Sequence, residues 1–178
     1  MSPLLPPVGS RDHVRGPADA RVTLLEYGDF ECPHCGALHP LLQAARKAFG
    51  GNLRIAFRHF PLRASHPHAL AAAKAAEAAG EQGKFWEMYD RLYQRQNELT
   101  EADLVRHARE LGLDAGRFEA SLGARAHETR IREDLASAAR SGVRGTPSLF
   151  INDEHYEGAL ERDELFAALA RAAVASVP

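Results

Sequence analysis

The sequence predicts an α/β domain with a central mixed sheet flanked by helices and an all-helical segment inserted between its two halves. Three observations lead to this prediction. A strand–helix–strand pattern covers residues 21–62, a helical pattern covers residues 63–142, and a strand–turn–strand–helix pattern covers residues 143–176. The chain has 178 residues, which is enough for one domain with a full hydrophobic core and short for two.

The first half begins after an N-terminal extension, residues 1–20, that is rich in proline, glycine and charge. Val22–Gly28 is a short apolar and β-branched run, typical of a buried strand. A helix pattern starts at Pro33 and ends at a glycine pair, and Leu53–Phe60 then alternates apolar and polar residues. The order of strand, helix and strand implies a parallel pair of strands.

The middle of the chain is helical in pattern, and it is too long for a single crossover helix. Ala69–Ala79 is rich in alanine, and Phe85–Tyr93 carries a broad apolar stripe. Thr100 begins a capping motif for a helix ending near Gly112, and we expect one further helix over Ala115–Ser141. We therefore expect an inserted helical subdomain.

The last part of the chain returns to the sheet. Thr146–Ile151 is β-branched and aromatic, Asn152-Asp153 is a turn signal, and His155–Gly158 is a returning strand. Glu161–Val174 has apolar residues on one face, which predicts a closing amphipathic helix.

Composition excludes several classes of protein. The formal net charge of −2 argues against a nucleic-acid binder, and no apolar run approaches the length of a membrane span. The N-terminus has no apolar core like that of a secretory signal, so we expect a cytoplasmic protein as written, or a periplasmic or other extracytoplasmic one if a leader was removed. We expect Arg54, Arg58 and Arg63 to form a solvated face without a partner.

The two cysteines are the most informative residues. Cys32 and Cys35 lie two residues apart, so a bond between them closes almost no loop, and their purpose must be redox chemistry or metal binding. A structural zinc site would need further ligands, for which His59, His66 and His68 are the nearby candidates. We favour redox chemistry, with no metal and no cofactor.

Three segments carry a family resemblance: Gly28–Cys35, which ends in Cys-Pro-His-Cys, Phe57–Leu62, and Gly145–Pro147. In sequence and order they resemble the DsbA branch of the thioredoxin superfamily, over about residues 12–173. The resemblance implies a thioredoxin-like fold and a thiol–disulfide oxidoreductase. The implied partners are protein thiols or disulfides, with a redox partner protein or glutathione.

The expected role of each residue in the Cys-Pro-His-Cys turn follows from its position at the start of the helix. Cys32 lies where the helix begins, so unpaired backbone N–H groups and the helix dipole stabilise its thiolate, the form that attacks a disulfide. Cys35, one turn on, faces inward and resolves the mixed disulfide. Pro33 fits the first helical turn because it lacks an N–H, and His34 can add positive charge or a hydrogen bond.

The resemblance adds three residues to the site. It implies that Glu26, in a buried strand, handles the proton of the inner thiol; the alternative is a strand residue without function. It implies that Pro147 follows a cis peptide bond, which turns the Thr146 backbone toward the cysteines, where an extended substrate can pair by strand addition.

The direction of the reaction stays open. The Cys-Pro-His-Cys turn favours an oxidant, but the best-known DsbA-type oxidases have valine where this chain has Thr146, and threonine is more typical of isomerases and reductases. We prefer the oxidant and keep the reductase or isomerase as the alternative. A glutathione-dependent transferase, which would not need Cys35, and a non-catalytic peptide-binding module are two further alternatives.

Overall fold

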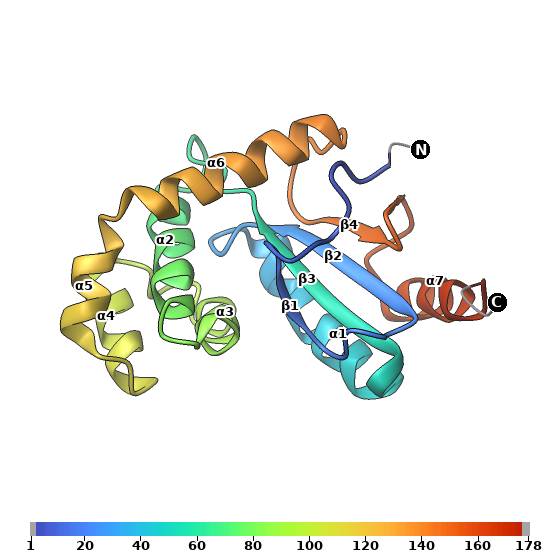
Figure 1. The fold of residues 1–178 in the computed structure, drawn as a ribbon, viewed down its shortest axis with the longest axis horizontal. Helices are drawn as coiled ribbons and strands as arrows, with labels where there is room; N and C mark the ends of the chain where they lie inside the picture. The colour runs from blue at the N-terminus through green and yellow to red at the C-terminus, as the bar shows by residue number, and fades with distance from the viewer. Residues whose placement is uncertain (1–2, 176–178) are drawn as a thin grey trace.

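A five-stranded mixed sheet forms the centre of the computed structural model, which describes residues 3–175 (Figure 1). The strand order is β1-β3-β2-β4-β5, and only β2 and β3 run parallel. The strands are β1 (His13–Arg15), β2 (Val22–Gly28), β3 (Leu53–His59), β4 (Ser148–Ile151) and β5 (Glu154–Tyr156). The predicted mixed sheet and parallel first pair are confirmed. Residues 1–2 of the expected extension and residue 176 of the expected last segment lie outside the described residues.

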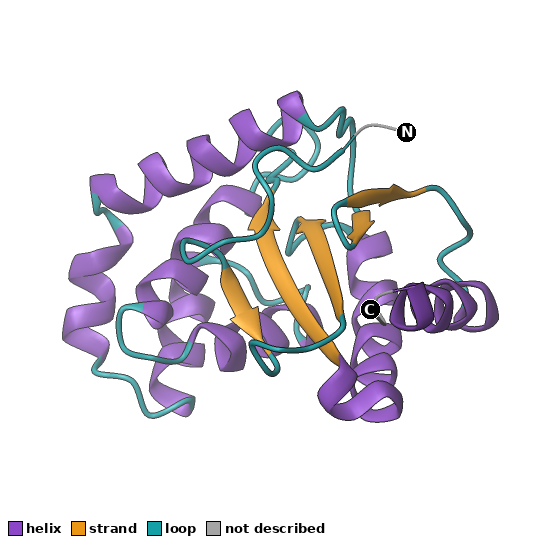
Figure 2. Ribbon diagram, turned by 45° about the vertical axis from the view of Figure 1, so that its right-hand side comes forward, coloured by secondary structure: helices purple, strands orange, loops and turns teal. Residues whose placement is uncertain are grey.

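Helices cover the sheet and extend beyond it. Helix α1 (Pro33–Phe49) and a short 3₁₀ turn (Gly50–Asn52) connect β2 to β3. Between β3 and β4 the chain forms α2 (Ala69–Gly80), α3 (Phe85–Gln94), α4 (Glu101–Glu110), α5 (Ala115–Leu122) and α6 (Arg125–Arg140), and α7 (Arg162–Ala175) follows β5. Figures 1 and 2 show α2–α5 gathered on one side of the sheet and α7 on the other, with α6 running back toward the strands.

One helix boundary was predicted wrongly. We expected a single helix over Ala115–Ser141, but the chain breaks between α5 and α6. Gly123 ends α5, and Ala124 has extended backbone angles before α6 begins. Asp114 caps the first of the two helices, because its side chain accepts a hydrogen bond from the backbone of Arg117. The break lets α5 pack against α2 and α4, while α6 packs against α2 and β3.

The N-terminal segment contributes to the fold, which the sequence did not predict. His13–Arg15 forms the edge strand β1, and His13 lies opposite Phe57 of β3. Leu4 is 1% exposed, and its backbone N–H donates to the carbonyl of Asp153. Residues 3–15 therefore cover one edge and one end of the sheet.

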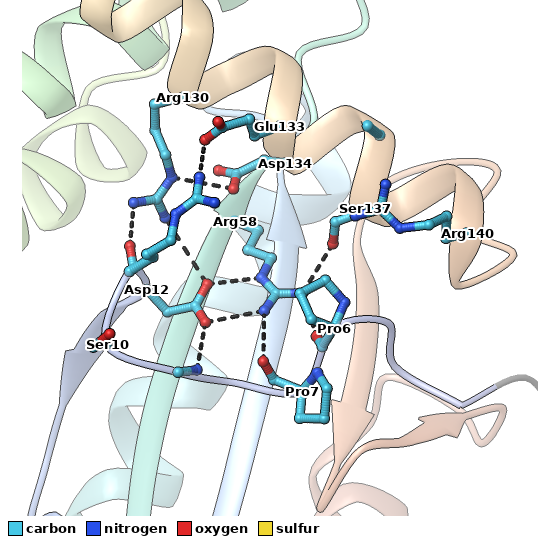
Figure 3. Close-up of a pocket in the computed structure, with 13 residues that line it drawn as sticks. Pro6, Pro7, Ser10, Asp12, Arg58, Arg130, Glu133, Asp134, Ser137 and Arg140 are labelled. Atoms are coloured by element: carbon cyan, nitrogen blue, oxygen red, sulfur yellow. Dashed lines mark hydrogen bonds and ion pairs between the residues drawn. The ribbon is translucent and has the colours of Figure 1, made fainter.

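Arg58 holds this segment in place, which corrects the expectation of a solvated arginine face (Figure 3). Arg58 is 3% exposed, and its guanidinium donates to both carboxylate oxygens of Asp12, at 2.7 and 2.9 Å. It also donates to the carbonyls of Pro6 and Pro7 and to the hydroxyl of Ser137. A buried charge is tolerated here because every donor group has an acceptor.

Two neighbouring apolar clusters on the α1 face of the sheet position the cysteines. One cluster joins β2, β3 and β4 to α1 and α7 through residues such as Leu24, Leu42 and Leu165. The other joins the start of α1 to the inserted helices and contains Cys32, Cys35, Phe57 and the aromatic side chains of α3. The cysteine pair therefore lies where the sheet meets the helical insertion.

Candidate functional site

The reactive turn is built by the end of β2 and the start of α1. Cys32 is the N-cap residue, with extended backbone angles, and Pro33 is the first helical residue. The N–H of Cys32 donates to the carbonyl of Asp29 at 3.1 Å, and the Cys32 carbonyl accepts from Gly36. The backbone N–H groups of His34 and Cys35, in the first turn of α1, bond to the sulfur of Cys32.

Two polar side chains hold this turn, and the sequence analysis missed both. The carboxylate of Asp29, 2% exposed, accepts bonds from the backbone of Glu31 and Leu62. The side-chain amide of Gln96 donates to the carbonyls of Phe30 and Cys32, at 2.9 and 2.8 Å. Gln96 lies 64 residues from Cys32, so no local pattern predicts the contact.

The environment of Cys32 favours a thiolate. Its pKa is lowered to about 5, first because the thiol of Cys35 donates to the sulfur and then because the Thr146 side chain and two backbone N–H groups do so as well. Burial opposes this effect, since Cys32 is 3% exposed. The backbone of His34 takes part, whereas the side chains of His34 and Pro33 are exposed.

Cys35 has the opposite character. It is fully buried, and burial raises the pKa of its thiol above the ordinary value. The neighbouring Cys32 and the charge of Glu26 raise this pKa further. The pair therefore consists of one thiol that loses its proton easily and one that keeps it, both unbonded in this structure.

Glu26 lies on β2, between Phe57 of β3 and Leu149 of β4, and is 1% exposed. Burial raises its pKa to about 7. The hydroxyls of Tyr89 and Tyr93 donate to its two carboxylate oxygens, at 2.7 and 3.1 Å, and these bonds limit the rise. A carboxyl group with this pKa can both accept and release a proton near neutral pH.

Thr146 and Pro147 face the cysteines from the loop before β4. Their peptide bond is cis, as predicted. The thiol of Cys32 donates to the Thr146 carbonyl, with a distance of 3.6 Å between sulfur and oxygen. Within the described part of the chain, the buried Thr146 hydroxyl has no hydrogen-bond partner while Cys32 is a thiol, which leaves it free to donate to the thiolate.

The histidines considered as zinc ligands have other partners. His59 contacts Glu77 at 2.8 Å, His66 contacts Asp29 at 2.7 Å, and His68 is exposed. Over residues 3–175, neither cysteine belongs to a group of three residues that could hold a metal.

The one group of this kind in that part of the chain is His13, His59 and Glu77, at the edge of the sheet. Glu77 contacts the Nε2 atoms of both histidines. A metal on Nε2 of His59 would require a proton on its Nδ1, which is buried and has no partner among the described residues. The arrangement therefore fits a hydrogen-bonded cluster, with His59 donating to Glu77 through Nε2, better than a metal site.

Comparisons with known proteins agree with this geometry. A family model described as thioredoxin matches residues 9–171. A thioredoxin-like oxidoreductase from Silicibacter pomeroyi is 30% identical, with a TM-score of 0.82 over 92% of this chain and 93% of that chain. The fold is also similar to alpha-DsbA1 of Wolbachia pipientis, which is 19% identical, with a TM-score of 0.84 over 99% of this chain and 98% of that one.

The fold and the two free thiols of Cys32 and Cys35 together define a thioredoxin-like domain with a Cys-x-x-Cys pair. This chain belongs to the thioredoxin family.

Curated relatives with closely similar sequences are much longer proteins. The Na⁺/H⁺ antiporter NhaA 1 of Salinispora arenicola is 47% identical over 169 residues, which cover 95% of this chain and 26% of that protein. The chain thus spans about a quarter of the length of the curated relatives it matches. Over residues 3–175, none of the helices has the length and apolar character needed to cross a membrane.

Proposed function

We propose that this chain exchanges disulfides with protein substrates through Cys32 and Cys35, in the oxidising direction. The observation that carries the proposal is the opposed proton affinity of the two thiols: the pKa of Cys32 is about 5, whereas that of Cys35 is raised. Such a pair has one sulfur ready to attack or leave as a thiolate and one that must exchange a proton whenever the bond between the cysteines forms or breaks. Glu26, with a pKa of about 7, is the group that gives this proton when the bond breaks and accepts it when the bond forms.

In the oxidising direction the Cys32–Cys35 disulfide is the electron acceptor. A substrate thiolate attacks Cys32, the bond between the two cysteines breaks, and Cys35 leaves with the electron pair and takes a proton from Glu26. A second substrate thiolate then attacks the substrate sulfur of the mixed disulfide, and Cys32 leaves as a stable thiolate. The substrate loses two electrons and the chain gains them. A redox partner protein or glutathione disulfide must then reoxidise the chain.

Substrate binding is proposed at the loop that carries Thr146. An extended segment of the substrate would pair with the Thr146 backbone, as a strand adds to the edge of a sheet. This brings a substrate sulfur next to Cys32, whose thiol already reaches the Thr146 carbonyl. Ion antiport, which the names of the longer relatives describe, is not part of the function proposed for this chain.

The low pKa of Cys32 supports the oxidising direction. A stabilised thiolate stabilises the reduced protein relative to the disulfide, which makes the disulfide a stronger oxidant. Such an oxidant is effective only where thiols are not kept reduced, so we propose an extracytoplasmic site of action. Thr146, in place of the valine of the best-known oxidases, favours the reductase or isomerase alternative.

Two assays test the proposal. Cys32→Ser should abolish both insulin reduction and oxidative refolding of a reduced substrate, whereas Cys35→Ser should accumulate mixed disulfides through Cys32. A Cys35→Ser variant that keeps full turnover with glutathione would instead indicate the transferase. Equilibration with glutathione buffers then gives the direction: a potential above that of glutathione supports an oxidant, and one near that of thioredoxin supports a reductase.

A further inference from the structure

The carboxylate of Glu26 is held from the side of the helical insertion, and this has a consequence for the proton step. Two hydroxyls from consecutive turns of α3 bind it, Tyr89 at 2.7 Å and Tyr93 at 3.1 Å. Tyr89 is 1% exposed and Tyr93 5% exposed, so water does not readily substitute for either hydroxyl. A buried phenol that donates to a buried carboxylate fixes the orientation of that carboxylate and stabilises its charged form.

Few other groups around Glu26 could orient its carboxylate or stabilise its charge. Glu26 faces Phe57 of β3 and Leu149 of β4, which are both apolar. Arg15 of β1 lowers the pKa of Glu26 through its charge, and its guanidinium is paired with Asp90. Cys32, at the N-cap of α1, raises the pKa of Glu26. Glu26 in turn raises the pKa of Cys35. The two tyrosine hydroxyls are therefore the direct hydrogen-bond donors that the structure gives to this carboxylate.

The backbone of β2 leaves room for this contact. Residue 28 is glycine, and a Cβ atom there would lie 2.5 Å from the hydroxyl oxygen of Tyr93 and 2.8 Å from Oε1 of Glu26. A side chain at this position would have to displace the ring of Phe57, the hydroxyl of Tyr93 or the carboxylate of Glu26. Gly28 thus permits the close approach of α3 to the buried carboxylate at the end of the strand.

We propose that Tyr89 and Tyr93 are positioning residues that hold the Glu26 carboxylate for proton exchange with Cys35. The inference rests on the proposed function, because it concerns the step in which the Cys32–Cys35 bond forms or breaks. When Cys35 attacks Cys32 of a mixed disulfide, the new bond forms, the substrate sulfur leaves with the electron pair, and the proton of Cys35 goes to Glu26. The tyrosines keep their own protons and act through Glu26.

Removing one hydroxyl has a predictable effect. Without a donor, the charged carboxylate is less stable and Glu26 holds its proton to higher pH. A bond to a charged group is strong enough to shift the midpoint of Glu26 upward by roughly one to two pH units. A shift of one unit lowers the ionised fraction of Glu26 at pH 7 about fivefold, and the resolution rate should fall in proportion. Tyr89→Phe should have the larger effect, because its bond is the shorter one.

The test compares Tyr89→Phe, Tyr93→Phe and the control Tyr27→Phe. Tyr27 is equally buried and lies next to Glu26 in β2, but its hydroxyl binds Arg58 and Ser137. The midpoint of Glu26 is measured directly in the oxidised protein from the ¹³C shift of its carboxyl carbon, assigned by comparison with Glu26→Gln. The pH profile of mixed-disulfide resolution is measured by stopped flow in the same variants.

The proposal is supported if the midpoint of the Glu26 carboxyl titration and the midpoint of the resolution pH profile both shift upward in Tyr89→Phe and Tyr93→Phe, and neither shifts in Tyr27→Phe. Unchanged midpoints in both variants would overturn it and leave the tyrosines as packing residues. The carboxyl titration needs no turnover, so it tests the positioning role of the tyrosines separately from the proposed function. If the wild type exchanges no disulfides but the midpoint still shifts, the proposed function fails and the positioning contact stands.

Discussion

Replacing Glu26 with glutamine should stabilise the protein at alkaline pH and lose this advantage in acid. In the folded protein burial raises the pKa of Glu26 to about 7, whereas an exposed glutamate in the unfolded chain titrates near ~4.3. A raised pKa means that the protonated carboxyl is the form that suits the fold. Its contribution to stability is fully present below pH ~4.3 and is lost as the pH rises through 7.

The magnitude follows from the difference between the two pKa values. A difference of roughly 2.5 units corresponds to about 3 kcal/mol of stability lost by the wild type between pH 4 and pH 8. Glu26 is 1% exposed, so solvent does not reduce this figure much. Glutamine keeps the volume of the side chain and can still accept a bond from Tyr89, but it carries no charge to desolvate.

The assay is denaturant unfolding of the oxidised protein at pH 4 and pH 8, which avoids titration of the thiols. The free energy of unfolding of Glu26→Gln, relative to wild type, should rise by about 3 kcal/mol between the two pH values. Glu87→Gln, an exposed side chain on α3, is the control for the substitution itself. A relative stability that is the same at both pH values would refute the raised pKa of Glu26.

Three further predictions concern the thiol pair, the turn and the N-terminal segment. A Cys32 pKa of about 5 should make the reduced protein more stable than the oxidised one at pH 7, by ~2 kcal/mol after allowance for solvent screening. Thermal melts of the two forms should show this difference in stability becoming smaller toward pH 4, because the pH then falls through the pKa of Cys32 in the folded protein. Gln96→Ala should cost about 1–3 kcal/mol in denaturant unfolding, because two carbonyls of the reactive turn lose their donor, and an unchanged stability would refute that role. Arg58→Met should cost about 3–5 kcal/mol, because the buried Asp12 carboxylate loses both bonds to the Arg58 guanidinium, and a cost no larger than that of Arg54→Met would contradict this reasoning.

Much of the fold could be predicted because its elements have strong local periodicity. The predicted strand Val22–Gly28 coincides with β2, and the helix predicted to start at Pro33 coincides with α1. Strand β1 could not be predicted, because three residues inside a segment rich in proline and glycine carry no period. The break between α5 and α6 was missed because apolar spacing continues across Gly123 and the turn is decided by packing.

Some residues of the candidate site could be predicted from local sequence, and others could not. Cys32, Pro33 and Cys35 form a contiguous motif, so their arrangement at a helix start follows from the local sequence. The tyrosines that bind Glu26 and the glutamine that binds the turn are 63 to 67 residues away from their partners. The aromatic stripe of α3 predicted a buried helix face, but a hydrophobic pattern does not show where a buried hydroxyl points.

The central claim is that Cys32 is the thiolate of the pair and Cys35 its buried partner, and alkylation of the reduced native protein tests it most directly. The rate of modification by iodoacetamide is measured from pH 3 to pH 9, and the modified residue is identified by mass spectrometry. The account predicts that Cys32 alone reacts, with a midpoint near pH 5. Faster modification of Cys35, or a Cys32 midpoint near the ~8.5 of a free cysteine, would contradict it.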